Sequence, residues 1–354
     1  MLKRLTTIMV ALLVAGGACK KESQETPAAD PKVASSDPAP AQPAEPAPDP
    51  AAAAEAEEKR KQAEELAKEL KKFEEEAAVE AKRWTDDLKK KASDLVARKF
   101  KSSKEALKAI TASPHRLPGN GERDRYRHPI ETLTFFGIEP SMTVVEVGSG
   151  AGWFTEILAP LLAREGKLVA VSYDPNGPPD SGRTVYGKRT QMFLARSPEL
   201  FGKVEVAHID PPSKIELGAP GSADLVLAIR EMHNWQSGGH IDAYLAAMHE
   251  VLKDGGKLGV VQHRARPDAR AEESAEMGYL PEAWLIAKIE SAGFKLEQKS
   301  KVNDNPKDTK DYAKGVWTLP PTYDEGEKDK EKYKAIGESD RMTLRFVKTA
   351  AATR

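Results

Sequence analysis

Three glycines, Gly148, Gly150 and Gly152, follow a run of β-branched residues that ends at Val147. Glycine has no Cβ, so the backbone can turn sharply at these positions and a ligand can approach it closely. An amphipathic stretch over residues 154–163 follows, and the first turn of a helix offers unpaired backbone N–H groups. The pattern predicts a strand, a ligand-binding turn and a helix. A tight turn without a ligand is the alternative.

Acidic side chains accompany this glycine loop. Glu146 precedes it, Asp174 follows the next strand-like run (168–173), and Asp210 follows the third run (204–209). An acid after the second strand accepts hydrogen bonds from ribose hydroxyls in many nucleoside sites, and open α/β sheets bind ligands at the carboxyl ends of their strands. Either aspartate alone could instead cap a loop. Together the three carboxylates predict a nucleoside-binding edge.

Two nearby patterns favour other interpretations. A dinucleotide fingerprint needs a third glycine at position 153, which is Trp153, and this disfavours a nicotinamide enzyme. Asp210-Pro211-Pro212-Ser213 resembles a motif of amino-methylating enzymes, but it follows the third strand and Ser213 stands where that motif has an aromatic residue. We interpret this segment as a turn.

Histidines follow the fourth and fifth predicted strands. His233 lies just beyond residues 225–229, and His263 follows residues 258–262 together with Arg264. Imidazole titrates near neutrality, so His233 could serve as a catalytic base. A structural hydrogen bond or a substrate-positioning role is the alternative.

The elements that must position these residues alternate from residue 113 onward, as in a mainly parallel α/β sheet. Strands are predicted over 143–147, 168–173, 204–209, 225–229, 258–262, 295–299 and 342–347. Helices are predicted over 154–163, 190–197, 240–252 and 281–292.

The N-terminal region has three different compositions. Residues 1–19 combine Lys3 and Arg4, a short apolar run and small residues before Cys19, which predicts a lipoprotein signal peptide with Cys19 as the lipidated residue. Residues 20–54 are rich in Pro and Ala and predict a disordered linker. Residues 55–110 have helical apolar spacing and many charges, which predicts a long helix, a helical hairpin or a coiled coil that could self-associate.

The overall composition excludes several classes of protein. Lys and Arg number 54 and Asp and Glu number 55, so nothing suggests a nucleic-acid partner. Cys19 is the single cysteine, so an internal disulfide and a cysteine-rich metal site are both excluded, and we expect no bound metal.

The domain over residues 113–348 resembles one bacterial branch of class I S-adenosylmethionine (SAM)-dependent methyltransferases. The resemblance rests on the glycine loop behind Glu146, on residues 123–129 and 131–137, on the histidine-containing turn and the His263-Arg264 pair, and on Asn305-Pro306 and residues 340–346. It implies a Rossmann-like seven-stranded sheet in the order 3-2-1-4-5-7-6 with strand seven antiparallel. The chain departs from the branch at Arg230-Glu231 before the histidine. The branch does not supply a methyl acceptor.

The resemblance also implies roles for the site residues. The residues expected to hold SAM are Glu146, Gly148, Gly150, Gly152, Asp174 and Asp210. Those expected to border a small-molecule or envelope acceptor are Arg125, Tyr126, His128 and His263, with His233 as the catalytic candidate. The signal places the enzyme at the bacterial cell envelope, lipid-anchored on the periplasmic side of the outer membrane. Because SAM is made in the cytoplasm, a non-catalytic nucleoside- or SAM-binding envelope lipoprotein is the alternative.

Overall fold

The computed structural model describes residues 50–349, with side chains from residue 54 onward. The predicted signal peptide, Cys19 and nearly all of the predicted linker lie outside the described residues. The chain divides into two units, residues 1–57 and residues 58–354. Only the start of helix α1 is described in the first unit, and everything below concerns the second.

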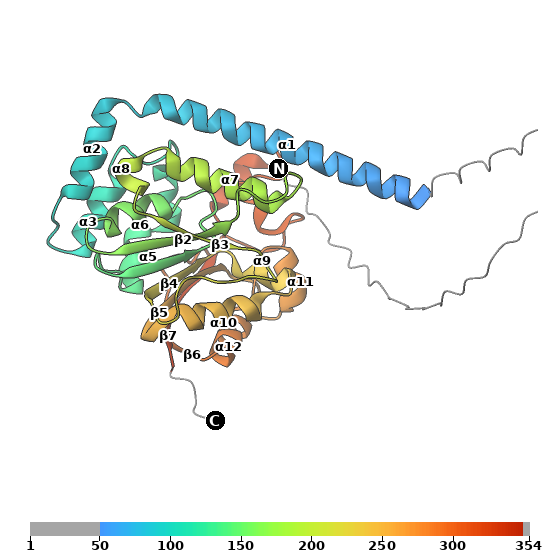
Figure 1. Ribbon diagram of the computed structural model, residues 1–354. Coiled ribbons are helices and arrows are strands. Elements are labelled where there is room, and N and C mark those ends of the chain that lie inside the picture. Colours follow the sequence, from blue (N-terminus) through green and yellow to red (C-terminus); the bar gives the residue numbers. More distant parts are fainter. Residues whose placement is uncertain (1–49, 350–354) are drawn as a thin grey trace, which may run out of the picture. The chain divides into compact units, whose positions relative to one another are not determined.

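A seven-stranded sheet forms the centre of the second unit, in the order β3-β2-β1-β4-β5-β7-β6 (Figure 1). Its strands are β1 (Thr143–Val147), β2 (Lys167–Tyr173), β3 (Glu205–Ile209), β4 (Ala223–Ile229), β5 (Leu252–His263), β6 (Phe294–Ser300) and β7 (Arg341–Lys348). Strands β1 to β5 pair in parallel, whereas β7 runs antiparallel to both β5 and β6. The predicted strand order and the antiparallel seventh strand are confirmed.

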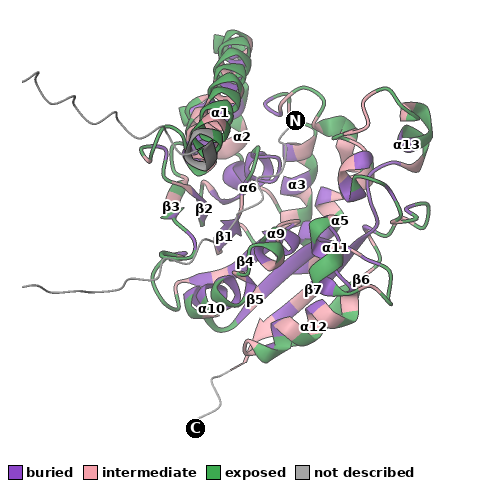
Figure 2. Cartoon of the chain, turned by 90° about the vertical axis from the view of Figure 1, so that its right-hand side faces the viewer, coloured by how far each residue is buried: buried purple, intermediate pink, exposed green. Residues whose placement is uncertain are grey.

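Helices cover both faces of this sheet. One face packs against α9 (Met232–Ser237), α10 (Ile241–Val251), α11 (Ala271–Glu276) and α12 (Glu282–Ser291). The other packs against α2 (Asp86–Ala97), α3 (Ser103–Thr111), α5 (Pro129–Phe136), α6 (Thr155–Leu162), α7 (Gly182–Ala195) and α8 (Pro198–Phe201). Strands β1, β2, β4, β5 and β7 are largely buried between the two layers, whereas the edge strands β3 and β6 are partly exposed (Figure 2). Both faces are covered because the strands are apolar on both sides, as parallel strands usually are.

The region expected as one long helix or hairpin consists of three helices, α1 (Pro50–Arg83), α2 (Asp86–Ala97) and α3 (Ser103–Thr111). Thr85 and Ser102 accept backbone hydrogen bonds at the starts of α2 and α3, as N-cap residues do. Leu107 of α3 is fully buried in the core on one face of the sheet. The compact domain therefore begins before residue 113, because the apolar stripes of α2 and α3 pack against the domain itself.

The long polar stretch between β6 and β7 wraps around one end of the sheet. It contains two short elements, η2 (Gly315–Thr318) and α13 (Lys330–Ile336). Small apolar clusters around Tyr279 and Tyr333 hold it in place. It brings Asn303 and Glu338 back to the carboxyl end of β5, where they join the site described below.

Candidate functional site

The glycine loop connects β1 to α6 at the middle of the sheet. Gly148 and Gly152 both have φ of +77°, a backbone conformation that L side chains rarely adopt. A Cβ on Gly148 would lie 2.6 Å from Cγ of Glu231, and a Cβ on Gly152 would lie 2.3 Å from the ring of Phe193. Gly148 thus makes room for the segment after β4, and Gly152 for helix α7. Gly150 is exposed, and its missing Cβ would be 3.9 Å from the nearest atom.

Glu146 supports this loop from beneath. Its side chain is 4% exposed and accepts a hydrogen bond of 2.7 Å from Oγ1 of Thr155, the first residue of α6. Burial raises the pKa of the carboxyl to about 8, so it is mostly protonated at neutral pH. Glu146 therefore holds the start of α6 against β1 and does not face the open side of the loop.

Asp174 and Asp210 lie on the same edge, at the ends of β2 and β3. Their preceding residues Tyr173 and Ile209 are partners in the strand register, so the two carboxylates start side by side. Both aspartates are exposed. Asp174 accepts a hydrogen bond from the backbone N–H of Asn176 (2.9 Å), whereas Asp210 pairs with Nη1 of Arg183 in α7 (2.6 Å).

The turn after β4 closes the other side of the glycine loop. Arg230 has φ of +62°, and its backbone N–H donates to the carbonyl of Val261 (2.7 Å). The half-buried Glu231 accepts a hydrogen bond of 3.0 Å from Nδ2 of Asn234 and covers Gly148. Burial raises the pKa of Glu231 to about 7, so its carboxyl is partly ionised at neutral pH. Sequence reasoning identified this pair only as a departure from the resembled branch.

His233 and His263 are brought together behind this turn. The centres of their rings are 5.6 Å apart, and the ring of Trp317 lies 5.7 Å from that of His233. Nδ1 of His233 lies 3.4 Å from Oε1 of Gln262, and Nδ1 of His263 lies 2.5 Å from Oγ of Ser339. Burial, helped by neighbouring positive charge, holds the pKa of His263 well below its usual range, so this imidazole is neutral at pH 7.

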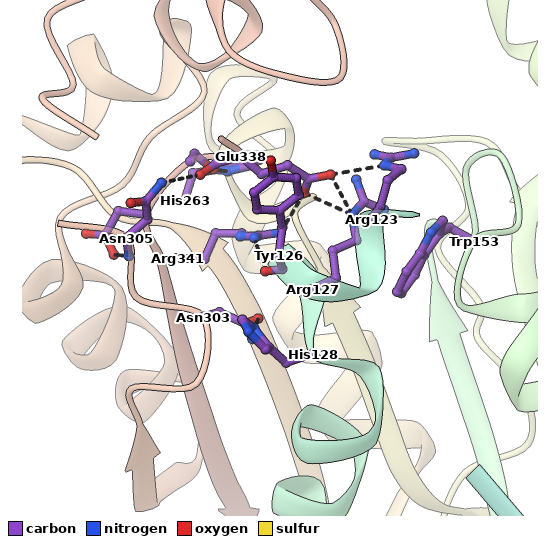
Figure 3. A network of polar contacts seen from close by, with 12 residues as sticks. Arg123, Tyr126, Arg127, His128, Trp153, His263, Asn303, Asn305, Glu338 and Arg341 are labelled. Carbon is purple, nitrogen blue, oxygen red and sulfur yellow. Dashed lines mark hydrogen bonds and ion pairs between the residues drawn. The ribbon is translucent and has the colours of Figure 1, made fainter. Parts of the chain in front are cut away.

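The residues expected to border an acceptor do not all point the same way. Tyr126 lies close to Arg123, Arg127 and Arg341 (Figure 3). Its backbone carbonyl accepts a hydrogen bond from Nη2 of Arg341 (2.6 Å). His128 contacts Oδ1 of Asn303 at 3.4 Å, away from those arginines (Figure 3). Arg125 is exposed, and its guanidinium lies over the ring of Tyr126.

An arginine cluster at this end of the sheet was missed by sequence reasoning. Arg123, Arg127 and Arg341 converge on Glu338, with N–O distances of 3.0, 2.9 and 2.9 Å (Figure 3). The guanidinium of Arg127 also lies 4.8 Å from the ring centre of Trp153 in the glycine loop. The available signal was the four-residue spacing of Arg123 and Arg127, which can place two side chains on one side of a helical turn.

The described part of the chain contains neither a metal-binding cluster nor a membrane-spanning helix. No group of three or more His, Cys, Asp or Glu side chains in residues 54–349 is placed to hold a metal ion. No helix in the region that the structure describes is long and apolar enough to cross a bilayer. A hollow of about 540 Å³ lies between β3 and α10, lined by His208, Lys214 and Glu250 among others, and the glycine loop does not border it.

A family model for protein-L-isoaspartate(D-aspartate) O-methyltransferases matches residues 126–204, which run from Tyr126 through β1 and β2 to just beyond the end of α8. No curated protein matches the sequence.

The solved structures that match this chain are distant in sequence. A SAM-dependent methyltransferase from Aquifex aeolicus is 16% identical with a TM-score of 0.42, over 71% of this chain and 100% of that chain. A 1,6-didemethyltoxoflavin-N1-methyltransferase from Burkholderia thailandensis, with its substrate and S-adenosylhomocysteine bound, is 17% identical with a TM-score of 0.40, over 65% and 80%. Human N-acetylserotonin methyltransferase in complex with SAM is 14% identical with a TM-score of 0.39, over 70% and 56%.

Proposed function

We propose that this domain is a SAM-dependent methyltransferase that transfers a methyl group to an acceptor not yet identified. One observation carries the proposal. The glycine loop opens at the point where the strand order reverses, between β1 and β4, and Asp174 and Asp210 follow the adjacent strands on the same edge. Open α/β sheets bind nucleotide-like ligands at such a switch point.

The loop has the properties that such a ligand requires. Oγ of Ser149 is buried and has no hydrogen-bond partner among the described residues, although a buried hydroxyl normally has one. The exposed backbone at Gly150 lets a ligand approach the loop. Both features fit a polar ligand lying across the loop.

Different side chains would bind different parts of SAM. Asp174 would accept hydrogen bonds from the ribose hydroxyls, and Asp210 would reach the adenine amino group on leaving Arg183. The glycines at 148, 150 and 152 give the loop its shape, and Glu146 fixes it from beneath. Glu231, partly ionised over Gly148, would receive the ammonium group of the methionine portion. Bound SAM would supply a methyl group carried on a sulfonium, which a nucleophile attacks in line with S-adenosylhomocysteine as the leaving group, so alignment and exclusion of water are the protein's main tasks.

The acceptor would lie on the β4–β5 side of the loop. His233 is the candidate base or positioning group there, with His263 behind it. Tyr126 would border this side, and His128 and Arg125 would contribute only at its margin.

Calorimetric titration of the full chain with SAM tests the proposal. Asp174→Ala should weaken binding roughly 10- to 100-fold, because a hydrogen bond to a charged group contributes about 1.5–3 kcal/mol. Asp180→Ala is the matched control, since Asp180 is an exposed acid in the same loop. Equal SAM affinities for the two variants, or no SAM binding by the wild type, would refute the proposed cofactor site.

The N-terminal sequence supports a location at the cell envelope and raises a second candidate function. Cys19 after a short apolar run favours lipid anchoring, although SAM is a cytoplasmic metabolite, so a binding protein without catalysis is the alternative. Incorporation of a labelled methyl group from SAM into a cell-envelope extract would separate the two. Palmitate labelling that is lost in Cys19→Ser would establish the anchor, and its absence in the wild type would exclude it.

A further inference from the structure

Positive charge exceeds negative charge at the end of the sheet formed by β4, β5 and β7. Four guanidinium groups gather there, those of Arg123, Arg127, Arg230 and Arg341. Glu338 is the one carboxylate hydrogen-bonded to Arg123, Arg127 and Arg341 in the part of the chain that the structure describes. The other acids nearby have their own contacts: Asp340 binds Arg264 and Lys310, and Glu231 accepts from Asn234.

Several donors of these arginines are buried and lack an acceptor. Nη1 and Nη2 of Arg127, Nε of Arg341 and Nε of Arg230 have no hydrogen-bond partner among the described residues. The Arg127 and Arg341 side chains are only 2% and 3% exposed. A buried charged donor without an acceptor is unfavourable, so the cluster is incomplete as a purely structural element.

The cluster also has a route to solvent. Arg123 is 26% exposed at its side chain, and Arg230 is half-buried. Arg230 stands in the left-handed region at φ +62°, which is strained for a residue with a Cβ and is characteristic of functional turns. Burial lowers the pKa of Arg230 to about 10, and the guanidinium still stays charged at neutral pH.

We propose that Arg127, Arg230 and Arg341 bind an oxyanion, a carboxylate or a phosphate, carried by the molecule that occupies the acceptor side. The arginine fork matches both groups in geometry. Arg341 begins β7, which is separated from β1 by β4 and β5, whereas Asp174 and Asp210 lie on the opposite side of β1. The anion and the nucleoside would therefore occupy opposite ends of this edge of the sheet. Oxyanion binding stands independently, whereas its assignment to the acceptor rests on the proposed function.

Calorimetry on the full chain with inorganic phosphate and with succinate, at constant ionic strength set with chloride, tests this site. Arg230→Asn should weaken binding at least 10-fold, and asparagine tolerates the left-handed backbone. Arg266→Gln is the matched control, because Arg266 is an exposed arginine paired with Asp268. Equal anion affinity in these two variants would overturn the proposal. Tighter binding of phosphate would indicate a phosphate group on the natural ligand, and tighter binding of succinate would indicate a carboxylate.

A second variant changes affinity in the opposite direction. Glu338→Gln removes the carboxylate that competes for the arginines, so anion binding should tighten at least 10-fold in protein that circular dichroism shows to be folded. Unchanged affinity would contradict the proposal. If Glu338→Gln does not fold, Arg127→Gln replaces it, with at least 10-fold weaker binding expected and unchanged binding contradicting the proposal.

Adding S-adenosylhomocysteine separates this inference from the proposed function. If the anion site serves the acceptor, saturating S-adenosylhomocysteine should leave phosphate affinity unchanged. Competition would show that the cofactor's own carboxylate fills the arginine cluster and would overturn the assignment to the acceptor. If S-adenosylhomocysteine does not bind while phosphate does, the proposed function fails and the oxyanion site remains.

Discussion

Replacing Glu146 with glutamine should change how the stability of the protein depends on pH. The carboxyl has a pKa of about 8 in the folded protein against an ordinary value of 4.5, because burial disfavours its ionised form. A raised folded pKa means that its contribution to stability is fully present below pH 4.5 and is lost as pH rises to about 8. At about 1.4 kcal/mol per pH unit, the wild type should lose roughly 4 kcal/mol relative to Glu146→Gln between pH 5 and pH 8.

Urea unfolding at a series of pH values measures this difference directly. Glutamine is nearly the same size and can still accept the hydrogen bond from Thr155, so the two proteins should be similarly stable at pH 5. Glu272→Gln, at an exposed position on α11, is the control and should follow the wild type at every pH. If the curves for the wild type and Glu146→Gln ran parallel from pH 5 to pH 8, the buried neutral carboxyl inferred here would be wrong.

Three further substitutions test the packing that positions the site, each by urea unfolding. Gly152→Ala should cost about 1–3 kcal/mol more than Gly221→Ala, because both glycines have positive φ but only a side chain at Gly152 would collide with Phe193; equal costs would contradict the packing. Glu156→Gln should cost about 3–5 kcal/mol, since this fully buried carboxylate holds two arginines; a loss below 1 kcal/mol would argue against it. Leu107→Ala should cost about 2–5 kcal/mol if α3 belongs to the core, and a neutral result would mean that α3 lies outside the core.

Much of the sheet could be predicted from the sequence because each strand is a short apolar run bounded by polar or glycine residues. The strand over residues 143–147 was predicted with its observed ends. Helix α7 was predicted only from residue 190, although it begins at Gly182. Glycine usually disfavours a helix. Gly187 nevertheless lies inside α7, because a Cβ at this position would be only 2.5 Å from the carbonyl oxygen of Tyr173 and no larger residue would fit. Tertiary packing determined the helix at that point, and local propensity could not show it.

The N-terminal helices illustrate a second limit of sequence reasoning. An amphipathic stripe indicates that a helix buries one face, but it does not identify the surface that covers it. Leu66 of α1 packs near Val185 of α7, and Leu107 of α3 packs in the main core. A helix that extends away from the domain and a helix that packs against it can have the same apolar spacing, so only the fold distinguishes them.

The candidate site was predicted in part, and the difference has a physical reason. The glycine loop and Asp174 are local in sequence, because each directly follows its own strand. The arginine cluster joins Arg127 to Glu338 across 211 positions, so no spacing in the chain indicates it. Glu146 was recognisable as an acid next to glycines, but its burial under α6 follows from packing that the motif does not encode.

Along the carboxyl edge of the sheet, acidic side chains lie at one end and arginines at the other. Two exposed aspartates lie beyond β2 and β3, partly ionised Glu231 covers the middle, and arginines gather beyond β5. The cofactor would lie with its hydroxyl and amino groups at the aspartates and its ammonium group at Glu231, and an acceptor that carries an anion would lie with that anion at the arginines. Since methyl transfer requires in-line alignment, this ordering of charge would set the direction of approach before any catalytic base acts.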